Sequence, residues 1–568
     1  MVYHKIVKVT PIEYRDVGDS PEDWLYRCYG PTCGGGEMED EVQWTIQVWD
    51  PPNFGVGVVD GAHGQTADIN VLAKNFQDNQ PQYAEVSNVK SRDAEDGMGQ
   101  FGCPMTGPAP PGTWELGFHP SVNMVARRLK SPLVGATASF AASQKVTEIV
   151  KSVIDDIRAN GDQAVRTYSE KFDKWAPPSF RLSDSQIQDI ISKVPEQTIK
   201  DIKEAQKNVR TFAQAQRDSI KDVEIEIQPG VFLGHRNNPI STAGAYIPGG
   251  RYPLLASAHM TITTAKVAGV KHVIACTPPI NGQIPHATVA AAHLAGADEI
   301  FILGGTQAVA AMAIGTETIK KVEFLAGPGN AFVAEAKRQL FGEIGIDLLA
   351  GPTETLIVAD EHADPFTVAT DLLSQAEHGP DTPAVLITTS ENVAQESIRF
   401  VDEQLKTLST AELAATSWRD YGEVVVVDDL DEAFALADDF ASEHVQILTQ
   451  KPREALEKMT NYGALFLGEK TCVSFGDKCI GTNHVLPTRK AGRYTGGLWV
   501  GKYLKTQTYQ EVVSEKASGE LGKLCGRCAR AENFEGHARS GDLRSQLYLK
   551  DQYDWIDQAR AAKQVNGH

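Results

Sequence analysis

Two patterns of apolar residues organise the chain beyond about residue 138. Between residues 143 and 219, apolar residues recur every three or four positions, the spacing of amphipathic helices that pack on one face. From residue 242 onward, short apolar runs of strand length alternate with helical segments in two series, over residues 242–342 and 354–450. This alternation predicts parallel sheets that are covered by helices on both faces.

The pattern therefore predicts an α/β fold with two Rossmann-like parallel-sheet domains, a helical N-terminal part and a small C-terminal segment. Between the helical part and the first series, "VEIEIQPGVFLGHRN" (residues 223–237) is expected to form a strand followed by a turn. In such folds, ligands bind between domains or at the carboxyl ends of the strands.

The first 130 residues differ from the rest because they are rich in Gly, Pro, Asp and Asn. Within them, "VQWTIQVWD" and "FGVGVVDG" alternate enough to predict two strands of a hairpin. "GVGVVDG" lacks the third glycine of a dinucleotide loop, and no helix follows it. We expect an extension of unknown function over residues 1–130, a catalytic region over residues 131–550 and a tail over residues 551–568.

Length and charge narrow the class of protein. A chain of 568 residues needs several domains, and a net charge of −20 argues against nucleic acid or an anionic membrane as partner. No apolar run of signal-peptide or membrane-span length occurs, so a soluble cytoplasmic protein is expected. Eight cysteines are too few for a disulfide scaffold, and the "CGRC" pair, Cys525 and Cys528, has no second pair at zinc-ribbon spacing.

Three glycine loops follow predicted strands of the first series: "YIPGGRYP", "LGGTQA" and "AGPGN". None is a GxGxxG motif, and each alone is more typical of a tight turn. Because all three lie at the carboxyl ends of strands in one sheet, a nucleotide site and a set of simple turns both remain open.

Four clusters of polar residues stand at the ends of predicted elements, and each sets a histidine beside a carboxylate or an amide. They are Gln375 and His378 in "QAEH", Glu443 and His444 in "SEH", Asp477 and His484 in "SFGDKCIGTNHVLPT", and Glu532, Glu535 and His537 in "ENFEGHARSGD". Singly, each fits a helix cap or a turn. Together, mixed nitrogen and oxygen donors predict a site for a borderline divalent metal. No HExxH motif is present, which disfavours a zincin-type protease.

Seven segments occur in the order found in one family: "GAYIPGGRYPLLASAHM", "GGTQAVAAMAIGTE", "AGPGNAFVAEAKRQ", "AGPTETLIVAD", "DLLSQAEHGPD", "SEHVQI" and "GTNHVLPT". On these segments the chain resembles the histidinol dehydrogenase family over about residues 135–548. The resemblance implies a zinc-dependent homodimer that oxidises a primary alcohol to a carboxylate through an aldehyde. It also implies two successive hydride transfers to NAD, with a small-molecule alcohol as substrate.

The resemblance further implies a role for each of twelve residues. The zinc ligands would be Gln375, His378, Asp477 and His537; the acid–base pair Glu443 and His444; the NAD contacts Tyr246, Gln307 and Asn330; and the substrate contacts Thr353, His484 and Glu532. In the family, the last zinc ligand comes from the swapped C-terminal segment of the partner subunit. His444 would take the alcohol proton, and Glu443 would deprotonate the water that attacks the aldehyde.

Two segments depart from the histidinol-oxidising pattern, beside a Ser-to-Thr exchange at Thr353. After "NHVLPT" the chain carries five cations, Arg489, Lys490, Arg493, Lys502 and Lys505, and its last motif reads "FEGHARSGDLR". Both resemble a branch that oxidises sulfopropanediol (2,3-dihydroxypropane-1-sulfonate) to sulfolactate. A cationic lining suits a sulfonate and repels the amine of histidinol, whereas the alternative for these cations is a solvated surface strip.

Three functions therefore compete at the level of sequence. The chain is expected to be an NAD-dependent dehydrogenase that acts on a CH–OH group, with oxidation of L-histidinol to L-histidine in amino-acid biosynthesis as one activity. Oxidation of sulfopropanediol is the second. A non-catalytic descendant that binds or scaffolds through its N-terminal extension is a remote third.

Overall fold

The computed structural model describes residues 126–133, 140–249, 253–349 and 351–565, together with six short strands nearer the N-terminus. The chain divides into two compact units, Met1–Met124 and Val125–His568. The strands of the first unit form two three-stranded sheets, ordered β5-β1-β6 and β2-β3-β4. They are β1 (Tyr26–Tyr29), β2 (Gln43–Asp50), β3 (Gly55–Ala62), β4 (Tyr83–Val86), β5 (Gln100–Gly102) and β6 (Trp114–Glu115). Strands β2 and β3 pair antiparallel, which confirms the predicted hairpin.

The second unit contains a five-stranded, fully parallel sheet of order β12-β11-β10-β13-β14. Its strands are β10 (Thr242–Tyr246), β11 (His272–Thr277), β12 (Glu299–Ile302), β13 (Phe324–Ala326) and β14 (Gly345–Ile346). The chain runs outward from β10 to β12 and then returns to the other side of β10 for β13. The strand order thus reverses between β10 and β13, and at such a switch point α/β sheets bind ligands.

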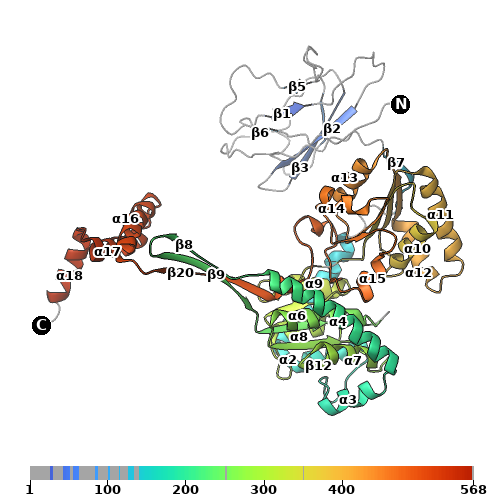
Figure 1. The fold of residues 1–568 in the computed structure, drawn as a ribbon, viewed down its shortest axis with the longest axis horizontal. Coiled ribbons are helices and arrows are strands. Elements are labelled where there is room, and N and C mark those ends of the chain that lie inside the picture. The colour runs from blue at the N-terminus through green and yellow to red at the C-terminus, as the bar shows by residue number, and fades with distance from the viewer. Residues whose placement is uncertain are drawn as a thin grey trace. The chain divides into compact units, whose positions relative to one another are not determined.

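Helices cover both faces of this sheet, as the first α/β series predicts (Figure 1). On one face lie α2 (Phe140–Asp173), α8 (Gly305–Ile314) and α9 (Ala331–Leu340); on the other lie α3 (Asp184–Ser192), α4 (Glu196–Ser219), α5 (Leu255–Ala258), the π-helix η3 (His259–Thr263), α6 (Thr264–Ala268) and α7 (His286–Ala295). Strand β11 shows why the strands are apolar throughout. Val273 and Ala275 enter one hydrophobic core, whereas Ile274 and Cys276 enter the other.

A second parallel sheet has the order β19-β18-β15-β16-β17-β7. Its strands are β7 (Arg127–Lys130), β15 (Thr355–Ala359), β16 (Ala384–Thr388), β17 (Gly422–Val426), β18 (His444–Leu448) and β19 (Ala464–Leu467), and its main helices are α10 (Pro365–Ala376), α11 (Glu391–Leu405), α12 (Ala411–Tyr421) and α13 (Leu430–Phe440). Strand β7 is antiparallel to β17, and Arg128 lies 2.5 Å from Glu423. Residues 127–130, which sequence placed in the extension, therefore belong to the second unit.

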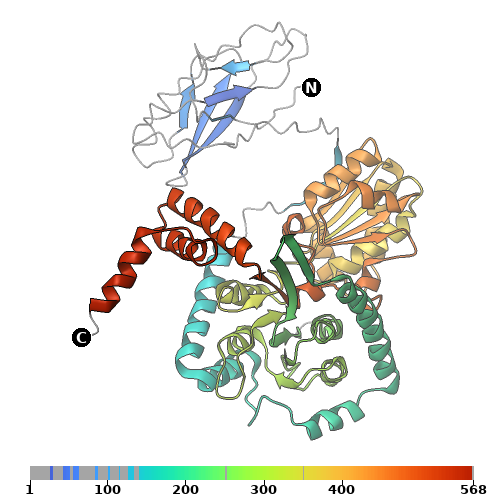
Figure 2. The same ribbon diagram turned by 60° about the vertical axis from the view of Figure 1, so that its left-hand side comes forward.

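A third sheet, antiparallel, leads to the C-terminal helices. It consists of β8 (Val223–Gln228), β9 (Val231–Pro239) and β20 (Leu504–Val512), and it is followed by α16 (Glu515–Ala531), α17 (Glu535–Leu549) and α18 (Asp554–Val565). Figure 2 shows these three helices, which we call the C-terminal arm, beyond the end of this sheet. Trp555 of α18 donates a hydrogen bond to Asp542 of α17 (3.0 Å), so α18, which sequence placed in the tail, packs against α17. No helix in the described part of the chain is long and apolar enough to cross a bilayer.

The loop after β13 passes the end of β10 at the switch point, in contact with the backbone of Tyr246. Gly327 has φ +129°, and a Cβ atom there would lie 2.0 Å from the carbonyl oxygen of Tyr246. A buried ion pair between Lys337 and Asp347 holds this glycine: the ammonium donates to its carbonyl (3.0 Å), and the carboxylate accepts its N–H (2.8 Å). Only glycine combines this dihedral angle with this approach.

Gly327→Ala is therefore expected to lower the midpoint of thermal unfolding more than Gly342→Ala does. Gly342 has a similar φ of +101° but open space around its Cβ position, so that variant reports backbone strain alone. We expect a further loss of at least about 2 °C for Gly327→Ala from the steric clash. Equal midpoints for the two variants, measured by circular dichroism, would show that the loop relaxes freely.

Candidate active site

A set of polar side chains lies at the amino edge of the six-stranded sheet. Glu443 precedes β18 and His444 begins it; His444 is paired in register with Thr355 of β15. Thr353 and Glu354 stand immediately before β15 and share that edge. Both strands are buried, and apart from Gln446 in the middle of β18 their polar side chains stand at the strand ends.

Helix α10 returns to the same edge because it connects the parallel strands β15 and β16. It begins with Asp364 as N-cap and Pro365 in its first turn, and its apolar face includes Leu372 and Leu373. Its last turn carries Gln375, and His378 follows two residues beyond its end. The "QAEH" motif is therefore the end of a crossover helix whose apolar face fixes the helix on the sheet.

Asp477 of the short helix α15 (Val473–Lys478) joins these groups. Its Oδ2 accepts a hydrogen bond from Nε2 of Gln375 (3.0 Å) and lies 3.9 Å from Nε2 of His378. Its Oδ1 lies 3.6 Å from Nε2 of His444, and its backbone carbonyl is 2.9 Å from Nδ1 of His484. Asp477 thus brings together three of the four predicted clusters, its own among them.

The carboxylate of Asp477 is ionised although it is buried. Burial alone would raise its pKa, but the hydrogen bond and the charge of His444 outweigh burial and hold the pKa well below its usual range. Burial in turn lowers the pKa of His378 and of His484, against the attraction of Asp477. The neutral imidazoles that result are the form that binds metals.

The donor set fits a divalent metal ion. Oε1 of Gln375 is buried and has no hydrogen-bond partner among the described residues. The side chains of Gln375 and His378 both reach the carboxylate of Asp477, and an amide, an imidazole and a carboxylate are a combination that suits zinc. Gln375, His378 and Asp477 can therefore share one ion, and an ion there would satisfy the buried oxygen.

Glu443 and His444 form a second group beside Asp477, held by the backbone of Glu354. Nδ1 of His444 lies 3.0 Å from the carbonyl oxygen of Glu354, and the N–H of Glu354 donates to Oε2 of Glu443 (3.1 Å). The two side chains approach each other to 3.5 Å. A proton on Nδ1 satisfies the carbonyl, so Nε2 is the nitrogen that faces Asp477.

The environment of this pair brings both groups into the range of acid–base work. Burial raises the pKa of Glu443 to about 8, against the attraction of His444. Burial alone would lower the pKa of His444, but Glu443 and then Asp477 raise it to about 9. The two groups therefore titrate as a coupled pair.

The three predicted NAD residues lie at the carboxyl edge of the five-stranded sheet. Tyr246 ends β10, and its hydroxyl accepts the N–H of Gly305 (3.0 Å) at the start of α8. Gln307 is in the first turn of α8, and Asn330 caps α9 across the switch point. The first sheet thus presents its carboxyl edge, as sequence predicts, and the second sheet its amino edge.

Two predicted site residues, His537 and Glu532, stand apart from the Asp477 group in a single chain. Both are exposed on the C-terminal arm, where the ring of His537 packs against Phe534 with centroids 5.3 Å apart. The arm is separated from α10 and α15 in Figures 1 and 2. Of the other substrate candidates, Thr353 is half-buried next to Glu354, and Nε2 of His484 lies 3.4 Å from Oγ of Ser257.

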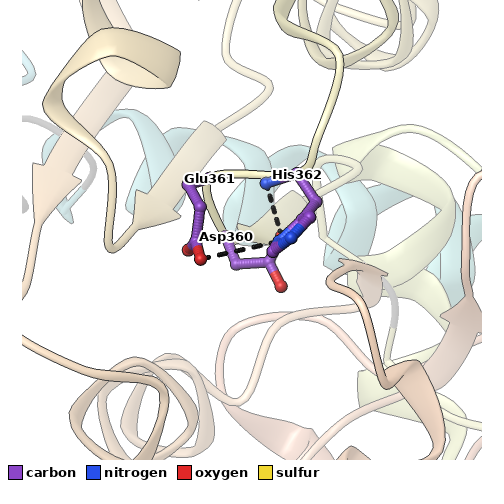
Figure 3. A group of neighbouring side chains, drawn as sticks. All are labelled: Asp360, Glu361 and His362. Atoms are coloured by element: carbon purple, nitrogen blue, oxygen red, sulfur yellow. Dashed lines mark hydrogen bonds and ion pairs between the residues drawn. The ribbon is translucent and has the colours of Figure 1, made fainter.

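A different group at the opposite edge of the second sheet also has the composition of a metal site (Figure 3). Nδ1 of His362 lies 3.5 Å from Asp360 and 3.6 Å from Glu361. However, the two oxygens of Asp360 accept the N–H groups of His362 (2.9 Å) and Gln450 (2.7 Å). The Asp360 carboxylate thus bridges the chain segments that follow β15 and β18. These backbone hydrogen bonds account for the group as a turn.

Sequence reasoning missed Glu354, although it quoted the "GPTE" motif that contains it. The available signal was a carboxylate directly before a buried strand, at the edge where Glu443 and His444 had already been placed. It also missed the Lys337–Asp347 pair, because nothing in the amphipathic pattern of α9 marks its lysine as buried.

Comparison with known proteins agrees with this fold. The family model for histidinol dehydrogenase matches residues 137–545. A histidinol dehydrogenase homolog of Shouchella clausii is 59% identical over 72% of this chain and 96% of its own length, and a sulfopropanediol 3-dehydrogenase of Ruegeria pomeroyi is 47% identical over 72% and 94%. The crystal structure of histidinol dehydrogenase from Elizabethkingia anophelis superposes with a TM-score of 0.68 at 34% identity and covers 72% of this chain and 97% of that one.

An α/β dehydrogenase with parallel sheets is the class that these matches and the site define. The chain belongs to the histidinol dehydrogenase family, which confirms the resemblance drawn from the seven segments.

Proposed function

We propose that this chain is a zinc-dependent, NAD-linked dehydrogenase that oxidises a primary alcohol to a carboxylate through an aldehyde. The observation that carries the proposal is the ionised carboxylate of Asp477, which joins a candidate metal set to the acid–base pair. Gln375 and His378 lie on one side of it and His444 on the other. A metal ligand and a base that share one buried group can act on the same substrate oxygen.

Each oxidation removes one hydride and one proton. Zinc on Gln375, His378 and Asp477 would supply Lewis acidity toward the substrate oxygen, and NAD would supply the hydride acceptor for both oxidations. His444 takes the hydroxyl proton through Nε2, while its Nδ1 stays oriented by the Glu354 carbonyl. Glu443 takes a proton from the water that adds to the aldehyde, and the hydrate then loses the second hydride and proton to give the acid.

The carboxyl edge of the five-stranded sheet supports NAD as the cofactor. Tyr246 and Asn330 flank the switch point, and Gln307 lies in the first turn of the adjacent helix α8. Helices α8 and α9 both begin at this edge, where their N-terminal N–H groups favour an anionic diphosphate. Gly327 lets the loop after β13 pack against the carbonyl of Tyr246, which holds the ends of β10 and β13 together at this edge.

Sulfopropanediol is the substrate that we favour over L-histidinol. One relative that aligns along most of its length bears the name sulfopropanediol 3-dehydrogenase. The segment after "NHVLPT" is basic, and its Arg489 lies beside Glu354 through a backbone hydrogen bond of 2.7 Å. Sulfopropanediol and sulfolactate are both anionic, so both complement the positive charge of this segment.

A substrate panel tests the proposal. Zinc-loaded protein with NAD and sulfopropanediol should form two NADH for each alcohol consumed, measured by absorbance against sulfolactate formed. Turnover of L-histidinol without turnover of the sulfonate would contradict the substrate assignment. A zinc-loaded protein that forms no NADH with either alcohol would contradict the activity itself and favour the non-catalytic alternative.

Two substitutions separate metal binding from proton transfer. His378→Ala should lower zinc content and turnover together because it removes a ligand. His444→Gln should keep the zinc but lower kcat by roughly 10²- to 10⁴-fold, the range for loss of a general base. Metal analysis and steady-state rates measure both effects, and loss of zinc from His444→Gln would reverse the assigned roles.

A homodimer in which the arm of one subunit completes the site of its partner accounts for the position of His537. Strand β8 exposes Val223, Ile225 and Ile227 by 41%, 53% and 53%. These residues alternate along the strand and so share one face. Exposed apolar surface of this kind marks an interface between proteins. The arm would then bring His537 and Glu532 to the Asp477 group of the partner.

Mixed dimers test this arrangement directly. His378→Ala and His537→Ala each inactivate the homodimer if both are zinc ligands. If His537 acts across the interface, co-refolded mixtures regain activity, because a dimer of one variant with the other contains one intact site. The expected yield is about a quarter of wild-type activity, since half of the dimers are mixed and each has one of two sites. Mixtures that stay inactive would place His537 in its own subunit's site; His444→Gln mixed with His378→Ala is the inactive control.

A further inference from the structure

The five cations after "NHVLPT" do not occupy equivalent positions. Lys490 lies 3.5 Å from Asp439, and Arg493 lies 2.6 Å from the same carboxylate and also donates to its carbonyl (2.8 Å). Lys505 is exposed in β20 and Lys502 lies in the short 3-10 helix η6 (Val500–Tyr503) that leads into it. Lys490 and Arg493 are thus already compensated at the end of α13, as a surface strip would be.

Arg489 differs because it is tied to the acid–base pair. The backbone N–H of Arg489 donates to Oε1 of Glu354 (2.7 Å). The backbone of Glu354 in turn contacts Glu443 through its N–H (3.1 Å) and His444 through its carbonyl (3.0 Å). Glu354 therefore links the backbone of Arg489 to both Glu443 and His444.

The local backbone fixes where Arg489 lies. Arg489 and Lys490 have φ of +53° and +63°, two consecutive left-handed residues that are not glycine. Such strain persists only where the surroundings enforce it, and here the Glu354 carboxylate and the hydrogen bond from the Gly351 N–H to Oγ1 of Thr488 do so.

Gly351 shows the direction of the side chain. A Cβ atom at Gly351 would lie 2.7 Å from Nε of Arg489. The arginine side chain therefore passes directly over the segment that carries Thr353 and Glu354, at the amino edge of β15. Any residue larger than glycine at position 351 would displace it.

We propose that Arg489 is the residue that selects an anionic substrate and that Glu354 is the residue that positions it. This inference rests on the proposed dehydrogenase function and assigns its substrate charge to one side chain. A guanidinium offers two parallel donors to a sulfonate or carboxylate, whereas it repels an ammonium group. Because Glu354 also holds Glu443 and His444, the distance between the anion site and the reacting carbon is set by a single residue.

Arg489→Gln is the test, with Lys490→Gln and Arg493→Gln as matched controls from the same segment. Each zinc-loaded variant is assayed with sulfopropanediol and with propane-1,2-diol, which lacks the charge. Arg489→Gln should lower kcat/KM for the sulfonate by roughly tenfold to a hundredfold, mainly through KM, because charge-assisted hydrogen bonds are lost. It should leave the uncharged diol unchanged, and both controls should change either substrate less than threefold. Arg489→Lys should recover part of the loss.

Glu354→Ala tests the positioning role, with Glu354→Gln as the variant that keeps an oxygen for the Arg489 N–H. The alanine variant should raise KM for the sulfonate more than KM for propane-1,2-diol, and the glutamine variant should behave closer to wild type. Calorimetric binding of sulfopropanediol to each zinc-loaded variant gives the same comparison without turnover.

The outcomes distinguish this inference from the proposed function. If wild-type protein oxidises the sulfonate but Arg489→Gln binds it as well as before, or loses both substrates equally, the role of Arg489 is overturned and the dehydrogenase stands. If wild-type protein neither binds nor oxidises the sulfonate, the anionic substrate is overturned together with the role of Arg489.

Discussion

Asp477 is a buried negative charge, and the arrangement of the site follows from how that charge is compensated. An isolated carboxylate in the interior costs several kcal/mol, so it persists only where donors and positive groups surround it. Here the amide of Gln375 donates to it, and the imidazoles of His378, His444 and His484 lie around it. A cation bound to this carboxylate would serve the same need, which is why a metal site and an acid–base pair meet at one residue.

The two parallel sheets contribute opposite edges, and their loops explain the difference. In the five-stranded sheet the loop after β13 packs directly against the carbonyl of Tyr246 because its first residue is Gly327, held by Lys337 and Asp347, and the predicted NAD residues lie at that carboxyl edge. In the six-stranded sheet the corresponding switch point is closed by Asp360, which accepts the N–H of Gln450. The polar residues of that sheet gather instead at its amino edge, where the crossover helix α10 ends.

Apolar periodicity predicted most of the fold, because strands buried on both faces leave a continuous apolar signal. Both strand–helix series and the long N-terminal helices are present where residue spacing placed them, whereas residues 223–237, expected to form one strand and a turn, contribute to two antiparallel strands, β8 and β9. Strand β7 was missed because a sequence such as Arg127–Lys130 has no alternation, and its place is fixed only by pairing with β17. The site was predictable as a set of residue types, but Glu354 and Arg489 act through backbone contacts that sequence spacing does not encode.

The account depends most on Gln375, His378 and Asp477 sharing one zinc ion. Anomalous X-ray diffraction at the zinc edge, from crystals of the zinc-loaded full chain, locates the ion without reference to activity. The account predicts one strong peak per subunit bound to these three residues, with the partner subunit's His537 as fourth ligand. A peak at Asp360, Glu361 and His362 instead, or one beside Asp477 without Gln375 and His378, would contradict it.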